Sequence, residues 1–176
     1  MSSLKGVVIN KGGTGPASGL SSTKSYLIAT GVAVAGKLIL NTVYEITNLK
    51  QAEDTLGITP SYDTTNGVVL HRHISDFYAK VIVNGVAVTL NDGVKLRIMV
   101  VDIATAVPSA LFTDANELYA KKLLKAGDNE PGINRLAFAF NVPADYTETR
   151  TDGLNSAIRA AISPAQAFAD WAYSTN

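Results

Sequence analysis

The strongest pattern for catalytic chemistry in this sequence is a glycine-rich segment that ends in a lysine. Gly31, Gly36 and Lys37 have the GxxxxGK spacing of a phosphate-binding loop, and a strand-like run precedes them. In such a loop, the residue after the lysine carries a hydroxyl group that binds Mg²⁺. A helix follows, and its N-terminus meets the phosphates. Leu38 stands there instead and begins a second strand-like run. We therefore expect no cofactor; nucleotide binding through this segment, with Asp102 as a Walker B-like carboxylate, remains an alternative.

The two histidines raise the question of a metal site, because Asp76 follows His71 and His73 closely. Residues two apart on a helix point about 200° away from each other, so these rings cannot converge on one ion. We expect His73 to be half-buried at the margin of an apolar helix face and His71 to be exposed. No metal site is predicted.

The remaining candidates for chemistry have structural explanations. The other carboxylates lie in expected caps and loops, where solvated or capping roles are usual: Glu117, Asp128, Glu130, Asp145 and Asp152. Phe138, Phe140 and Trp171 are expected to be core or interface aromatics, since no basic residues interleave them as a nucleic-acid groove requires. We predict a protein without catalytic residues.

Composition supports one domain with a real core. The chain has 176 residues, of which 47% are hydrophobic, and it has no cysteine, which excludes thiol catalysis and disulfides. Lysine plus arginine equals aspartate plus glutamate at 15 each, so no excess positive charge is available to bind a nucleic-acid backbone. No apolar run approaches the roughly 20 residues of a membrane span, and no cleaved signal is evident. We expect synthesis in the cytoplasm and no nucleic-acid or membrane partner.

The first 24 residues differ from the rest. A short β-branched run at residues 4–9 (LKGVVI) precedes a stretch at residues 10–24 that is dominated by Gly, Ser, Thr and Pro and has little to bury. This pattern predicts a flexible N-terminal arm over residues 1–24 and a domain over residues 25–176.

Periodicity within the domain predicts alternating strands and helices. Strands are expected at residues 26–35, 38–46, 96–101 and 135–140, of which 96–101 is expected to be fully buried, and Asn84-Gly85 predicts a β-hairpin near residues 81–90. Asn48, Gln51 and Gly57 have the spacing of helix caps around residues 49–56. An amphipathic helix is expected to carry Leu70, Ile74, Phe77 and Tyr78, after a turn-rich stretch at residues 60–67.

The C-terminal part is expected to be mostly helical. A helix capped by Thr113 or Asp114 is expected to end at Gly127, with a face that carries Ala115, Leu118, Tyr119, Leu123 and Ala126. Another helix would carry Leu154, Ile158, Ala161 and Ile162, and Ser163-Pro164 would start a separate last helix. The predicted fold class is α/β, a mixed sheet flanked by helices.

Several of these segments together resemble the sheath subunits of contractile phage tails and related contractile injection machines. The resemblance rests on GVAVAG at 31–36, VYEITNLKQAEDTLGI at 43–58, HISDFYA at 73–79 and LRIMVVD at 96–102. The segments AKKLL at 120–124, RLAFAFNVPADY at 135–146 and DGLNSAIRAAISPAQAFADWAY at 152–173 look like the continuation found in a sheath-like group from prophages and injection systems.

The resemblance implies a mechanical function without catalysis. Sheath subunits stack in helical layers around an inner tube, so the implied partners are further copies of this chain and an inner tube protein, in a virion tail or a cytoplasmic assembly of a bacterial host. Another tail component, a tube or terminator protein, is the alternative within this class. Sheath proteins are usually much longer; the end at Asn176 fits a shortened chain, a truncated prophage gene or a small member of the group, and implies an incomplete α/β core.

The resemblance also implies that subunits exchange terminal arms. Leu4, Val7, Val8 and Ile9 have the composition of a strand that could be added to the sheet of another copy. The alternative is that this run folds back on its own sheet or stays disordered.

Overall fold

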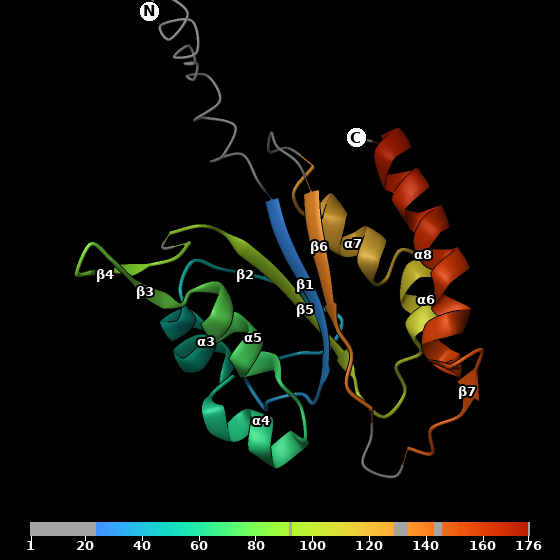
Figure 1. Ribbon diagram of the computed structural model, residues 1–176, viewed down its shortest axis with the longest axis horizontal. Helices are drawn as coiled ribbons and strands as arrows, with labels where there is room; N and C mark the ends of the chain where they lie inside the picture. Colours follow the sequence, from blue (N-terminus) through green and yellow to red (C-terminus); the bar gives the residue numbers. More distant parts are fainter. Residues whose placement is uncertain (1–23, 92, 129–133, 143–145, 176) are drawn as a thin grey trace, which may run out of the picture.

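A mixed four-stranded sheet forms the centre of the domain, and helices cover both of its faces (Figure 1). The computed structural model describes residues 24–91, 93–128, 134–142 and 146–175. The sheet consists of β1 (Lys24–Gly31), β2 (Val43–Ile46), β5 (Leu96–Asp102) and β6 (Asn134–Ala139). Its order is β2-β5-β1-β6, with β1 parallel to both neighbours and β2 antiparallel to β5. The expected α/β class with a mixed sheet is confirmed.

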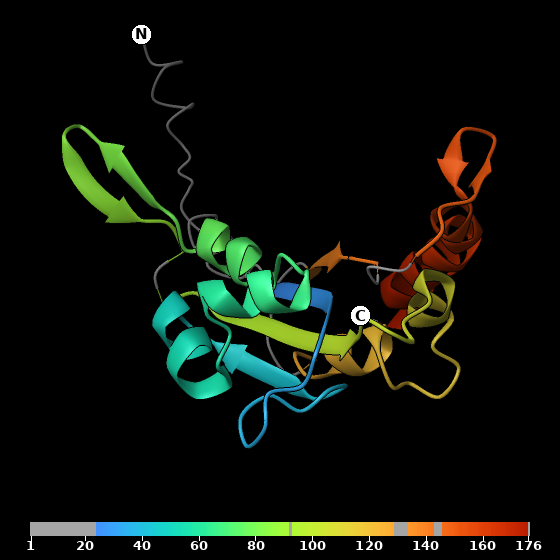
Figure 2. The same cartoon turned by 90° about the horizontal axis from the view of Figure 1, so that it is seen from below.

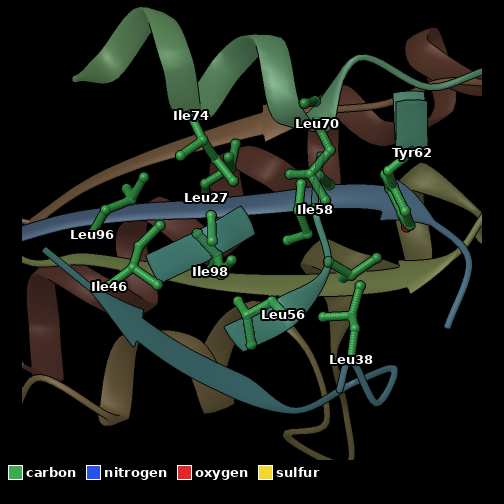
Figure 3. Close-up of a cluster of buried hydrophobic side chains, with 14 of the residues drawn as sticks. Leu27, Leu38, Ile46, Leu56, Ile58, Tyr62, Leu70, Ile74, Leu96 and Ile98 are labelled. Carbon is green, nitrogen blue, oxygen red and sulfur yellow. The ribbon is translucent and has the colours of Figure 1, made fainter. Parts of the chain in front are cut away.

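The mostly apolar sequence of β5 follows from burial on both faces of the sheet. Ile98 and Val100 point into one hydrophobic cluster, whereas Met99 and Val101 point into a second cluster on the opposite face. Figure 3 shows the first cluster, in which side chains of the sheet meet side chains of the helices above it.

Three helices form the layer over the first cluster: α3 (Leu49–Leu56), α4 (Pro60–Asn66) and α5 (Leu70–Phe77). The bounds and caps of α3 are as predicted. Asn48 Oδ1 accepts a hydrogen bond from the backbone N–H of Gln51 at 3.0 Å, and Gly57 ends the helix with a left-handed φ of 72°.

The expectation of turns at residues 60–67 is wrong, because α4 fills this stretch. Thr59 is its N-cap, with its hydroxyl 3.3 Å from the Tyr62 N–H, and Pro60 stands in the first turn, where its missing N–H costs no hydrogen bond. Tyr62 is the buried residue of this short helix, so α4 has too few apolar residues to show a helical period.

The layer on the opposite face contains α6 (Pro108–Thr113), α7 (Ala120–Lys125) and α8 (Ser156–Thr175). The expected helix up to Gly127 is shorter than predicted, because α7 begins only at Ala120. Asp114 still caps it from a distance: its carboxylate accepts backbone N–H groups of Leu118, Tyr119 and Lys121 at 2.6 to 3.1 Å.

The two expected C-terminal helices are one. α8 runs through Pro164 without a break, although a proline inside a helix removes one hydrogen bond. Leu154 lies outside it, in a small hairpin of β7 (Arg150–Thr151) and β8 (Leu154–Asn155).

Both strands expected before residue 47 are shorter than predicted. β1 ends at Gly31 and β2 begins only at Val43. Between them, Gly36 and Asn41 have left-handed φ angles of 72° and 57°, which a continuous strand does not allow.

The predicted hairpin is confirmed as β3 (Lys80–Val83) and β4 (Val86–Thr89). Asn84 and Gly85 have φ angles of 51° and 80°, as a type I′ turn requires. In Figure 2 this hairpin projects away from the sheet and its helices.

The predicted arm lies outside the described residues except for Lys24, which begins β1. In the described ranges, no helix is long and apolar enough to cross a membrane.

Candidate functional site

The segment with phosphate-loop spacing forms a tight turn between two strands. Val34 and Leu38 pair through backbone hydrogen bonds of 3.0 and 2.9 Å in opposite directions, and the next regular element is β2. Lys37 Nζ donates to the carbonyl oxygen of Asp54 in α3 at 3.0 Å. The lysine thus ties the turn to α3, where a phosphate-binding lysine would face the N-terminus of the following helix.

Asp102 lies where the alternative function would place a carboxylate, but it has a structural contact. It is the register partner of Gly31 at the ends of parallel β5 and β1, and its Oδ1 accepts the backbone N–H of Ala104 at 2.9 Å. A cavity of about 80 Å³ beside it is also lined by Asn41, Thr105 and Tyr119. Asp102 is the single carboxylate in this lining, so the cavity lacks the paired groups of acid and base catalysis.

Tyr62 of α4 contacts the backbone at the end of β1, beside Gly31. The Tyr62 hydroxyl donates to the Val32 carbonyl oxygen at 2.7 Å and accepts the Val32 N–H at 2.8 Å. A Cβ on Gly31 would lie 2.5 Å from that hydroxyl oxygen and 2.8 Å from Val100 Cγ1, so only glycine fits without a shift. Burial raises the pKa of Tyr62 above its usual value.

The expectation for the histidines is wrong, because their environments are reversed. The His71 side chain is only 13% exposed, and its Nε2 lies 2.9 Å from Glu53 Oε1 of α3. His73 is exposed. Asp63 fixes the position of the first turn of α5, because its carboxylate oxygens accept the backbone N–H groups of His71 and Arg72 at 2.9 and 3.0 Å. Across the described residues, no group of three or more potential metal-ligating side chains comes together.

Among the other carboxylates that the structure describes, Glu117 and Asp152 make surface contacts, and Asp128 is exposed. Lys125 Nζ lies 2.5 Å from Glu117 Oε2, which lowers the pKa of Glu117 mainly through this hydrogen bond. Asp152 pairs with Arg159. Glu130 and Asp145 lie outside the described residues.

The three aromatic residues singled out above pack into the second hydrophobic cluster, together with α6 and α8. Trp171 stacks on Phe168 with ring centroids 5.7 Å apart, and Lys121 Nζ lies 5.2 Å from its ring centroid. An apolar groove of about 260 Å³ remains beside them, lined by Pro108, Leu111, Phe112, Phe138, Phe140, Ile158, Ala161, Ile162 and Ala165.

Several exposed apolar residues of the described chain lie together on the β3–β4 hairpin. Ile82, Val83, Val86 and Val88 are 70%, 51%, 62% and 44% exposed. No charged residue occurs between Lys80 and Asp92 in the sequence. Asn91 fixes the base of the hairpin to the body, since its Nδ2 donates to the Phe77 carbonyl oxygen at 2.7 Å.

A large cavity lies between α5 and the sheet edge at β6. We call it the β6 cavity; its volume is about 730 Å³, and its lining is Ser25, Tyr26, Leu27, His73, Phe77, Asn91, Val94, Leu96, Arg135, Leu136, Ala137, Phe138 and Ala139. Arg135 is the one arginine, lysine, aspartate or glutamate in this lining. In the described part of the chain, β6 pairs with β1 only, so its outer edge has unpaired backbone groups.

The sequence predicted the hairpin but not the β6 cavity. Residues of α5 and of β6 line the cavity, although they are about sixty residues apart in the sequence. No local spacing pattern predicts that these two elements come together. The predicted interaction residues Leu4, Val7, Val8 and Ile9 lie outside the described residues.

Comparisons with known proteins give one match. No curated protein and no solved structure matches this chain significantly. A family model described as "DUF2586, N-terminal domain" matches residues 4–166. The match covers most of the chain, which therefore belongs to the DUF2586 N-terminal domain family.

Proposed function

We propose that this chain is a structural subunit of a contractile tail sheath or a related injection apparatus. It acts through contacts with further copies of itself and with an inner tube protein, and not through catalysis. The sequence resemblance at residues 31–36, 43–58, 73–79 and 96–102 gives the class of assembly.

The exposed apolar hairpin is the observation that carries the proposal. The larger contiguous apolar patches on the surface of soluble proteins are often interaction sites. The groups that could have performed chemistry, by contrast, have structural contacts: Lys37 with α3, Asp102 with its own turn, and His71 with Glu53. The described surface is therefore better suited to association than to catalysis.

Self-association of the purified chain tests this proposal first. Size-exclusion chromatography with light scattering is expected to show association that rises with concentration. Electron microscopy of the chain mixed with the tube protein of the same gene cluster is expected to show helical layers around a tube. A strictly monomeric profile at high concentration, together with tubes that stay bare, would contradict a sheath function.

The N-terminal run is proposed to join the copies. The linker at residues 10–24 can extend about 45–50 Å, which is a typical spacing between subunits. In this proposal Leu4, Val7, Val8 and Ile9 add a strand to the sheet of another copy, where main-chain hydrogen bonds give affinity.

Two changes test the arm. Deletion of residues 1–11, or Val8→Pro, which removes a ladder donor, is expected to leave the melting temperature nearly unchanged and to abolish ordered assembly. Val8→Thr keeps the donor and serves as the control. If the truncated chain still forms the same polymer, or loses several kcal/mol of monomer stability, the arm belongs to its own subunit.

Two alternatives remain open to experiment. A tube or terminator protein would form rings or thin tubes of its own in electron micrographs. A nucleotide-binding protein would bind Mg²⁺-ATP at micromolar concentration through Lys37, and Lys37→Ala would abolish that binding. We expect no binding by either form of the chain.

A further inference from the structure

Two hollows flank β6, one on each face of the sheet. The β6 cavity, of about 730 Å³, lies on the face of α5, and the apolar groove of about 260 Å³ beside α8, which we call the α8 groove, lies on the other face. Phe138 of β6 lines both of them. Protein interiors are close-packed and contain few voids larger than a water molecule. Two hollows beside one edge strand therefore indicate a place for a further segment of chain.

The position of α8 points to the same place. α8 lies on the side of β6 that faces away from β1 (Figure 1, Figure 2), beyond the edge of the sheet. Ile158 and Ile162 of α8 line the α8 groove and are 45% and 56% exposed. A strand added beside β6 would give these side chains apolar contacts, as a sheet does for the helices that cover it.

The edge of β6 fits an extended strand. In the described part of the chain β6 pairs with β1 only, so its outer N–H and carbonyl groups can form a further ladder. Side chains of an added strand alternate between the two faces of the sheet, so they would enter the β6 cavity and the α8 groove in turn. Both hollows are lined mostly by apolar residues. The fitting segment is therefore apolar on both of its faces.

The run at residues 4–9 (LKGVVI) has this composition. Val7 and Val8 are adjacent, so as a strand the run presents an apolar side chain on each face, and Lys5 is its single charged residue. The family model matches the chain from residue 4 onward. The run thus belongs to the unit that the family shares.

The chain before the described residues joins the sheet beside this edge. Lys24, the first described residue, is the register partner of Asn134 at the start of β6. A strand position beyond β6 lies two strand spacings, about 10 Å, from β1. The linker at residues 10–24 can extend about 45–50 Å, so the run can reach the β6 edge of its own chain or that of an adjacent copy.

The opposite edge of the sheet is less suited to a further strand. Glu45 of β2 forms ion pairs with Arg97 at 2.8 Å and with Lys95 at 3.3 Å. Charged side chains on an edge strand oppose the addition of another strand. In β6, by contrast, Arg135 near one end is the single charged residue.

We propose that the run at residues 4–9 docks along the outer edge of β6, with its side chains in the β6 cavity and the α8 groove. It runs antiparallel to β6, because this direction separates Lys5 from Arg135 and brings Ile9 to the end of the sheet where β1 begins. Exchange of the run between copies rests on the proposed function, whereas the docking position does not.

Disulfide crosslinking tests the docking position, because the chain has no cysteine of its own. Ala137→Cys places a thiol on β6, where Ala137 is exposed and lines the cavity. The second thiol is Val7→Cys in one series and Val8→Cys in another. Adjacent residues of a strand point to opposite faces, so one of these two positions should crosslink to β6 about fivefold more than the other.

Two formats separate contacts within a chain from contacts between copies. In the first, both cysteines are in one full-length chain, which is oxidised at high dilution. In the second, full-length single variants with tags of different size are mixed and oxidised. The control replaces Ala137→Cys by Val86→Cys, a valine 62% exposed on β4, whose outer edge is also open in the described structure. This pair should stay at background.

Prolines at Lys5 and Gly6 test whether main-chain hydrogen bonds hold the run. Adjacent N–H groups of a strand point to opposite sides, so in either register one of the two donates to β6 and is lost. The crosslink should fall several-fold. Serines at both positions keep the donors and are the matched control. Circular dichroism should show all variants folded, since Ala137 and Val86 are exposed.

A crosslink to Ala137→Cys with one strong and one weak position supports the docking position in either format. Equal yields at the two positions, or yields no higher than with Val86→Cys, would overturn it. If the crosslink forms within single chains alone, β6 is the docking site and the exchange between copies in the proposed function is refuted. Helical particles without any crosslink to β6 would refute this docking position and leave the sheath function intact.

Discussion

β5 and the β3–β4 hairpin are built from the same kinds of residues and have opposite environments. Leu96 to Val101 of β5 are all buried, because a helical layer covers each face of the sheet. In the hairpin, Ile82, Val83, Val86 and Val88 are exposed by 44–70%, and both edges of the two-stranded ribbon are open in the described structure. Isolated two-stranded hairpins are marginally stable in water.

This difference separates two uses of apolar β-branched residues. In β5 they contribute to the free energy of folding of one chain, whereas in the hairpin the same area is available for association. The comparison predicts that equivalent substitutions affect folding in one region and assembly in the other.

The largest effect is expected from Ile98→Ala in β5. Ile98 has no exposed surface and lies in the first hydrophobic cluster (Figure 3). Removing its side chain should cost about 2–5 kcal/mol of unfolding free energy, because transfer and cavity terms add. Urea denaturation measures this cost. A loss below about 1 kcal/mol would mean that this face of β5 is not tightly packed.

Gly31→Ala is expected to come next, at about 1–3 kcal/mol, because the new methyl group would overlap the Tyr62 hydroxyl and Val100. The matched control is the same change in a Tyr62→Phe background, where the hydroxyl is gone. The cost of Gly31→Ala should be lower there by about 0.5 kcal/mol or more. Additive costs would show that the hydroxyl is not the obstacle.

Tyr62→Phe alone is expected to cost about 1–2 kcal/mol, because the Val32 N–H and carbonyl lose their partner. The raised pKa of Tyr62 adds a pH dependence, since the unfolded chain loses the phenolic proton more readily than the folded one. The contribution of Tyr62 should be complete below pH 10.0, the ordinary value, and should decline above it. Urea midpoints of wild type and variant should converge in that range; parallel curves would contradict the assignment.

Local signals in the sequence predicted those elements whose ends and faces are set locally. The caps Asn48 and Gly57 predicted α3, and Asn84-Gly85 predicted the hairpin turn. α4 was missed because it buries little besides Tyr62 and has no apolar period, although Thr59, Pro60 and Gly67 mark its ends.

Errors arose where tertiary contacts decide the outcome. Ser163-Pro164 has the signature of a helix start, but α8 packs along α6 as one helix through that point. The partial burial of His71 depends on Glu53 in another helix, which helical phase alone does not reveal. The β6 cavity is likewise a property of the assembled layers, so the sequence predicted the hairpin but not the cavity.

The smallest effect on folding is expected from Ile82→Ala, which makes the same chemical change as Ile98→Ala in the other region. Ile82 is 70% exposed, so the unfolding free energy should change by no more than about 0.5 kcal/mol. Association should weaken, because Ile82 is the most exposed large apolar residue of the hairpin.

Light scattering across a concentration series, run beside urea denaturation of the same samples, separates these two effects. The comparison holds if Ile98→Ala lowers the denaturation midpoint while Ile82→Ala shifts association to higher concentration and leaves the midpoint in place. If Ile82→Ala instead destabilises the monomer as Ile98→Ala does, the hairpin packs on its own chain in solution. Its exposed side chains would then be part of the core of a single copy.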